Sequence, residues 1–125
     1  MAKILIVEDN PDNLKLFRAI LAMKGHQVTA LPTGDGLLPA IAETRPDLLL
    51  MDIQLPGKDG YELLKEVRNS QWRSLGVIAL TAHARGQDEE RGRDAGFDGY
   101  ITKPIDIATF PEQVDRALAR QPLSR

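Results

Sequence analysis

Five polar residues that could carry chemistry directly follow apolar segments of this 125-residue chain. Glu8 and Asp9 come after the first segment, Asp52 after the third, Thr81 after the fourth and Lys103 after the fifth. In an open parallel α/β sheet, ligands bind at the edge where the strands end, so these side chains are expected to converge there. They would bring carboxylates, a hydroxyl and an ammonium group into one site.

Asp52 is the candidate nucleophile of this set. An aspartate after a strand often forms a turn or caps the next helix. Asp59 is the better cap for the helix that follows, which leaves Asp52 without a structural role. A carboxylate in this position can attack phosphorus and form an aspartyl phosphate.

The acidic residues Glu8, Asp9 and Asp52 predict a magnesium (Mg²⁺) site. Glu8 and Asp9 could simply favour the start of the first helix, but Asn10 and Asp12 already fill that role. Carboxylates brought together raise one another's pKa unless a cation lies among them. A cluster of oxygen ligands suits Mg²⁺, which also binds phosphate oxygens readily.

Thr81 and Lys103 are the candidate partners of phosphoryl oxygens. Alone, Thr81 would be an ordinary β-branched strand end and Lys103 a surface lysine with its stem on apolar surface. Beside a carboxylate nucleophile and a cation, the hydroxyl and the ammonium instead fit oxyanion stabilisation.

Continuous apolar segments separated by helix-length spacers predict a five-fold βα repeat with a parallel sheet that is covered on both faces. The predicted strands are Ile4 to Val7, Val28 to Leu31, Leu48 to Met51, Val77 to Leu80 and Gly99 to Ile101.

The helix signals lie between these strands. Asn10 and Pro11 predict a helix start and Gly25 its end, and Asp59 should cap a third helix that buries Leu63, Leu64 and Val67. A fourth helix is expected over residues 87–94 and a fifth from Asp106. Pro39 and Pro111 favour late starts for the second and fifth helices, because an interior proline removes a backbone hydrogen bond.

The composition narrows the class of protein. A net charge of −2 with scattered basic residues argues against direct nucleic-acid binding, and no apolar segment approaches the length of a membrane span. The sequence has no cysteine and no signal-peptide pattern, so the cytoplasm is the expected compartment.

The chain closely resembles the receiver domain of bacterial two-component response regulators. The matching segments are Ile4 to Asn10, Pro46 to Gly57, Asp59 with Gly60, Ile78 to Ala82, and Ala95 to Pro104. The resemblance implies a flavodoxin-like (βα)5 doubly wound sheet with strand order 2-1-3-4-5. The resemblance covers about Lys3 to Leu118. Because only a short polar segment follows Arg120, we expect a receiver domain over residues 1–120, a short tail over 121–125 and no output domain.

The resemblance also assigns roles to individual residues. It makes Asp52 the phosphoacceptor, Glu8 and Asp9 magnesium-site acids, and the backbone carbonyl of Gln54 a further metal ligand. Thr81 and Lys103 would contact the phosphoryl oxygens. Tyr100 would be the aromatic residue that moves on activation, and the Lys103–Pro104 bond would be cis. His83 and the Gln54 side chain would tune hydrolysis, whereas Trp72 is interpreted as loop packing.

The implied function is that of a single-domain response regulator phosphorylated by a histidine kinase or a histidine phosphotransfer protein. Its output would be a protein contact through the face of the fourth helix, fifth strand and fifth helix, or onward phosphorelay, as a monomer or a phosphorylation-linked dimer. It would assist its own Mg²⁺-dependent phosphorylation without small-molecule turnover.

Two alternatives share parts of this pattern. A Mg²⁺-dependent phosphatase with an aspartyl nucleophile would need an acid/base aspartate where Gln54 stands. A flavin-binding module would need a phosphate loop after the first strand, where Glu8 and Asp9 would repel a phosphate.

Overall fold

The computed structural model describes residues 2–53, 55, 60–81 and 96–120. Its five strands form one parallel sheet in the order β2-β1-β3-β4-β5, as predicted. The strands are β1 (Lys3–Val7), β2 (Gln27–Leu31), β3 (Leu48–Asp52), β4 (Val77–Thr81) and β5 (Gly99–Thr102). The helices are α1 (Pro11–Met23), α2 (Leu37–Thr44), α3 (Gly60–Arg68) and α5 (Phe110–Leu118). The fourth helix predicted over residues 87–94 lies outside the described residues.

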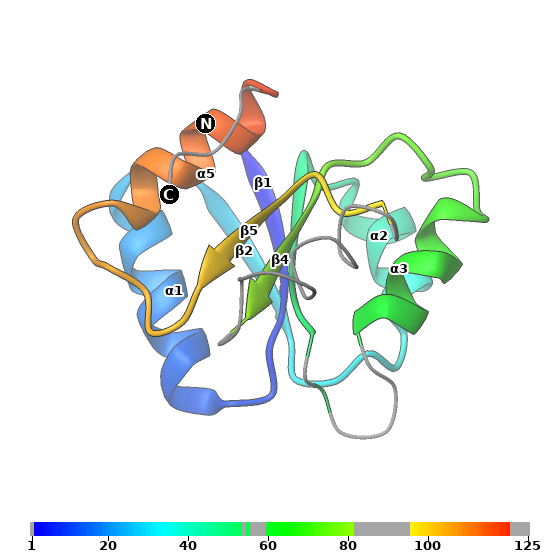
Figure 1. Cartoon of the computed structure of the whole chain (residues 1–125), viewed down its shortest axis with the longest axis horizontal. Coiled ribbons are helices and arrows are strands. Elements are labelled where there is room, and N and C mark those ends of the chain that lie inside the picture. The colour runs from blue at the N-terminus through cyan, green and yellow to red at the C-terminus, as the bar shows by residue number, and fades with distance from the viewer. Residues whose placement is uncertain (1, 54, 56–59, 82–95, 121–125) are drawn as a thin grey trace.

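Helices cover both faces of the sheet, which gives the predicted flavodoxin-like architecture. Figure 1 shows α1 and α5 on one side of the strands and α2 and α3 on the other. Alternate strand residues serve the two layers: Ile4 and Ile6 pack on the side of α1 and α5, whereas Leu5 and Val7 pack on the side of α2 and α3. This two-sided burial explains why the strands are continuously apolar.

Helix α1 begins as the sequence predicts. The Asn10 side chain accepts hydrogen bonds from the backbone N–H groups of Asp12 (2.9 Å) and Asn13 (3.1 Å), and Pro11 is the first helical residue. Gly25 follows the helix with a φ of 82°, a backbone conformation that favours glycine. The start of α1 is therefore fixed by local chemistry next to the end of β1.

Both prolines lie in the first turn of their helices, so the predicted late starts are confirmed. Pro39 is in the first turn of α2, and Pro111 follows Phe110 at the start of α5. The prediction that α5 begins at Asp106 is wrong. Asp106 instead accepts a hydrogen bond from the Ala108 backbone N–H (2.9 Å), and a turn separates it from the helix.

Arg68, the last residue of α3, joins three segments at the edge of the sheet where β4 and β5 begin. Its guanidinium donates to the carbonyl oxygens of Arg73 (2.8 Å), Leu75 (2.6 Å) and Gly96 (2.7 Å), and to Asp98 Oδ2 (3.0 Å). The same Asp98 oxygen accepts the backbone N–H of Val77 at 2.8 Å. This network holds the starts of β4 and β5 together, far from the edge where the strands end.

Trp72 packs against the hydrophobic layer of α2 and α3, so the packing interpretation of this residue is confirmed. None of the helices in the described parts of the chain combines the length and the apolar character needed to cross a membrane.

Candidate functional site

The ends of four strands position the predicted site residues through backbone hydrogen bonds to their neighbours. The N–H of Glu8 donates to the carbonyl of Leu31 (3.0 Å), next to the end of β2. Beyond Asp52, the N–H of Ile53 donates to Leu80 (3.1 Å). These bonds continue the hydrogen-bonding pattern of the parallel sheet past the regular strands. The backbone of the polar residues is therefore held by the sheet.

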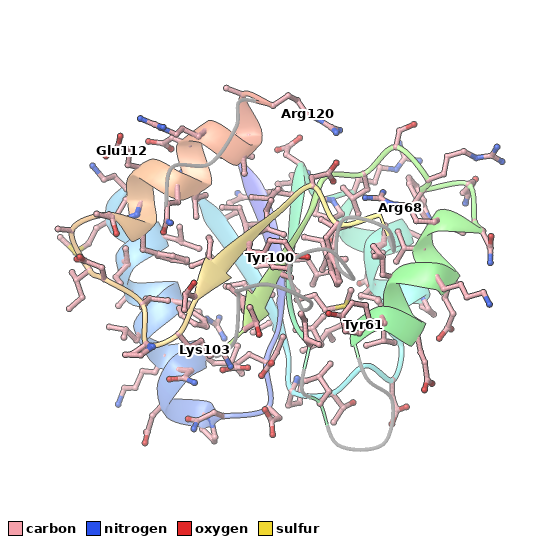
Figure 2. The ribbon with its side chains drawn as sticks, viewed as in Figure 1. Tyr61, Arg68, Tyr100, Lys103, Glu112 and Arg120 are labelled. Atoms are coloured by element: carbon pink, nitrogen blue, oxygen red, sulfur yellow. The ribbon has the colours of Figure 1, made fainter. Side chains whose placement is uncertain are left out.

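Lys103 bridges two of the predicted acids. Its backbone N–H donates to the carbonyl of Thr81 (2.8 Å), and its side chain turns toward the sheet edge (Figure 2). The Nζ atom lies 2.8 Å from Asp52 Oδ2, 2.8 Å from Glu8 Oε1 and 3.1 Å from Glu8 Oε2. One ammonium thus joins carboxylates delivered by β1 and β3.

Burial sets the electrostatics of the cluster. Glu8 has 0% of its surface exposed and Asp52 4%, whereas Asp9 is exposed. Burial raises the pKa of Glu8 from its usual 4.5 to about 7, and its hydrogen bond with Asp52 acts in the same direction. Hydrogen bonds from Lys103 and Asn13 oppose this rise. The Glu8 carboxyl is therefore held in a place where its negative charge is costly unless a cation is near.

Lys103 keeps its charge in this setting. Burial alone would lower the pKa of Lys103, but hydrogen bonds and attraction to Asp52 and Glu8 raise it above 10.5. The ammonium is thus a fixed positive charge at neutral pH.

The acidic cluster fits a magnesium ion. Glu8, Asp9 and Asp52 each offer a carboxylate oxygen, and these oxygens lie within 4.8 Å of one another. Three carboxylates against one ammonium leave an excess of two negative charges at full ionisation. Hard oxygen ligands with one solvent-exposed side are the donor set that Mg²⁺ accepts while keeping some of its waters.

Three further predicted residues, Thr81, Tyr100 and Pro104, lie on or just after β4 and β5. Thr81 ends β4 with 4% of its surface exposed, and its register partner on β5 is Thr102, the residue before Lys103. The Lys103–Pro104 bond is cis, as the resemblance implied. Tyr100 lies on β5 with its ring centroid 6.4 Å from that of Phe97. The predicted metal ligand Gln54 and the tuning residue His83 lie outside the described residues.

Asn13 is a site residue that the sequence did not reveal. Its side-chain Nδ2 donates a 2.7 Å hydrogen bond to Glu8 Oε1, from the first turn of α1. The sequence does place a polar side chain five positions after Glu8. Asparagine is so common at helix starts, however, that this position alone does not indicate a site residue.

Comparison with known proteins identifies the family. Residues 4–115 match the sequence profile of the response regulator receiver domain. The chain belongs to this family. The receiver is a phosphoacceptor switch in two-component signalling rather than a turnover enzyme, so the phosphatase alternative does not hold, and a histidine kinase is the implied partner.

Individual relatives span nearly the whole chain. The polar-differentiation response regulator DivK of Brucella anthropi is 43% identical over 112 residues, which make up 89% of this chain and 91% of the relative. The receiver domain of a sensor histidine kinase from Pseudomonas aeruginosa has a TM-score of 0.84 and 35% identity, covers 94% of this chain and 98% of its own, and is described with a magnesium ion coordinated in its active-site cleft. The chemotaxis response regulator CheY4 of Vibrio cholerae has a TM-score of 0.87 and 26% identity with the same coverage.

Proposed function

We propose that Asp52 accepts the phosphoryl group in this receiver, from a histidine kinase or a histidine phosphotransfer protein. The observation that carries the proposal is the 2.8 Å contact between Asp52 Oδ2 and the Lys103 ammonium, inside a cluster with Glu8 and Asp9. Asp52 is the cluster carboxylate that comes from the central strand β3.

The transfer exchanges one bond for another. An Asp52 carboxylate oxygen attacks the phosphorus of a phosphohistidine, an oxygen–phosphorus bond forms, and the nitrogen–phosphorus bond breaks with its electron pair left on the imidazole. The phosphoryl oxygens carry the developing charge, so positioned positive groups favour the transfer.

Lys103 and Thr81 are the groups proposed to meet that charge. The Lys103 ammonium already lies against Asp52, where it could pair with an oxygen of a phosphoryl group bonded to that carboxylate. Thr81 ends the strand next to Asp52 and can donate its hydroxyl to another oxygen. Both residues are held by the sheet, so little ordering is required at the moment of transfer.

Glu8, Asp9 and Asp52 would hold Mg²⁺, with the backbone carbonyl of Gln54 as a further ligand. A bound Mg²⁺ supplies charge neutralisation for the phosphoryl oxygens. The excess negative charge of the cluster and the magnesium reported in the Pseudomonas aeruginosa relative support this assignment. The exposed carboxylate of Asp9 leaves one side of the site accessible to the donor protein.

The output is proposed to be a protein contact or onward phosphorelay in the cytoplasm. Phosphorylation adds roughly −1.5 to −2 charges. Attraction of Lys103 and Thr81 to that charge would shift the conformational equilibrium of β5, which carries Tyr100. Coupling between such sites is typically about 1–3 kcal/mol. The face of the fourth helix, β5 and α5, which includes Tyr100, is proposed to contact the effector, and the fourth helix expected over residues 87–94 lies outside the described residues.

A matched pair of aspartate variants tests the phosphoacceptor. Asp52→Asn should abolish hydroxylamine-sensitive labelling from a phosphorylated histidine kinase. Asp47→Asn makes the same chemical change at the residue immediately before β3. The Asp47 side chain accepts a hydrogen bond from the backbone N–H of Lys3 (2.9 Å), and the variant should be labelled normally. Peptide mass spectrometry locates the phosphoryl group. Labelling that survives in Asp52→Asn would overturn the assignment.

A further inference from the structure

The Glu8 carboxylate has two side-chain donors with different freedom to move. Lys103 donates to both of its oxygens and also to Asp52, whereas Asn13 donates to Oε1 alone, at 2.7 Å. If Lys103 turns toward a phosphoryl group, its bonds to Glu8 weaken. The bond from Asn13 is independent of that movement.

Asn13 is fixed by the helix that carries it. Helix α1 buries Phe17, Ile20 and Leu21 against the sheet, and Asn13 is half-buried in its first turn. The Nδ2 group therefore approaches Glu8 from a rigid element. A carboxylate orientation fixed in this way survives changes elsewhere in the cluster.

The amide of Asn13 supplies what an acidic residue in the same turn could not, which is a hydrogen-bond donor to Glu8. The first turn of a helix favours acidic residues through its positive dipole end, and Asn has the shape of Asp. An aspartate here would place another carboxylate against Glu8 Oε1, whereas the amide presents a hydrogen-bond donor. The amide also brings no positive charge that would compete with a metal cation.

We propose that Asn13 is a positioning residue for the magnesium site, which holds the Glu8 carboxylate in the orientation that a divalent cation requires. This inference rests on the proposed magnesium role of Glu8. Residues that orient metal-binding carboxylates are worth about 10- to 100-fold in metal affinity in other sites.

Magnesium affinity of the unphosphorylated protein, measured by calorimetry, tests the proposal. Asn13→Ala is expected to weaken Mg²⁺ binding about tenfold. Asn10→Ala is the matched control: it removes the helix cap and loosens the same turn but leaves the Asn13 amide in place. It should change the affinity less than twofold. Equal weakening in both variants, or no weakening in Asn13→Ala, would overturn the proposal.

A double-mutant cycle separates orientation of Glu8 from any other effect of Asn13. In a Glu8→Ala background, Asn13→Ala should cause no further loss of Mg²⁺ affinity, because the oriented carboxylate is already gone. An undiminished tenfold loss in that background would contradict the role. A wild-type protein that binds no Mg²⁺ would also overturn it.

The contact between Asn13 and Glu8 can also be tested by NMR in the absence of Mg²⁺. The side-chain amide resonances of Asn13 in the NMR spectrum should shift in Glu8→Ala, and unchanged resonances would count against the contact. Labelling of wild-type Asp52 is scored separately. Failed labelling with a tenfold affinity effect rejects the phosphoacceptor assignment alone, whereas normal labelling without that effect rejects the Asn13 role alone.

Discussion

The Lys103 ammonium donates a 2.8 Å hydrogen bond to Asp52 Oδ2 across 51 residues of sequence. The same nitrogen contacts Glu8, so one positive charge is shared between two buried carboxylates. A shared cation stabilises the cluster without metal and can be redistributed when charge is added. The stability of the metal-free cluster therefore depends on one side chain.

Replacing Lys103 by methionine should destabilise the metal-free protein. Removing one partner of a buried ion pair leaves uncompensated charge, and the partial exposure of Lys103 reduces the expected cost to about 2 kcal/mol. Urea unfolding at pH 8 with a chelator measures the loss, and added Mg²⁺ should restore part of it. Lys65→Met, at an exposed position of α3, is the control and should cost little. Equal losses would contradict the expectation.

Glu8 should make stability depend on pH between about 4.5 and 7. Its pKa in the folded protein is about 7, above the 4.5 of the unfolded chain, so the folded state binds more protons in this window. Stability from this group is present below pH 4.5 and declines as pH rises to about 7. The pKa of Lys103 is raised from its ordinary 10.5, so the titration of that group lies at higher pH and does not interfere.

Glu8→Gln isolates that contribution. In chelator, wild-type stability should fall relative to Glu8→Gln by roughly 1–3 kcal/mol between pH 4.5 and 7.5. Guanidinium unfolding at several pH values gives the difference directly. A difference that is constant with pH would show that folding does not shift the pKa of Glu8, and one that grows in favour of the wild type as pH rises would show that folding lowers it.

Gly60→Ala should disturb the end of β3. A Cβ atom on Gly60 would lie 2.7 Å from Ile53 Cα and 2.9 Å from the Asp52 carbonyl oxygen, and backbone atoms cannot move aside cheaply. The expected cost is about 1–3 kcal/mol, with slower labelling of Asp52. Gly76→Ala is the control, since its Cβ would meet the Leu48 Cδ1 methyl at 3.3 Å. The free energy of unfolding of Gly76→Ala should lie within about 0.5 kcal/mol of the wild-type value. Similar losses of stability in both variants would argue against a clash at Gly60.

Arg68→Met should destabilise the fold by about 2 kcal/mol or more. The change removes the donor of three backbone carbonyls and of Asp98 at the starts of β4 and β5. Arg116→Met removes a similar side chain from an exposed pair with Glu112 (2.9 Å) and should cost less than about 0.5 kcal/mol. Thermal unfolding compares the two, and equal midpoints would refute the bridging role of Arg68.

The strands and the position of the site could be predicted from the sequence because their signals are local. Apolar segments such as Leu48 to Met51 are covered on both faces, and a parallel sheet brings the residues after them to one edge. The actual strands β3 and β4 include Asp52 and Thr81, one residue beyond the predicted ends. Backbone pairing continues there although the side chains become polar.

The start of α5 could be predicted only in part. Pro111 correctly indicated a late start, but Asp106 has the side chain of a helix cap and uses it in a turn instead. A helix cap and an isolated turn can both make the hydrogen bond from Ala108 to Asp106, so the residue type alone cannot decide between them. The contacts of Asn13 with Glu8 and of Arg68 with Gly96 were missed for a related reason, because they depend on where two elements meet in space.

The all-parallel pairing of the described sheet has a kinetic consequence. Each of its four strand pairings joins segments separated by an intervening crossover, so the sheet grows through non-local contacts. Such topologies fold more slowly than those built from neighbouring hairpins. The contact between Glu8 and Lys103 spans 95 residues, so it can form only after β1 and β5 have joined the same sheet. A newly synthesised chain therefore gains the Glu8–Lys103 ion pair late, and that ion pair would report that β1 and β5 have joined the sheet.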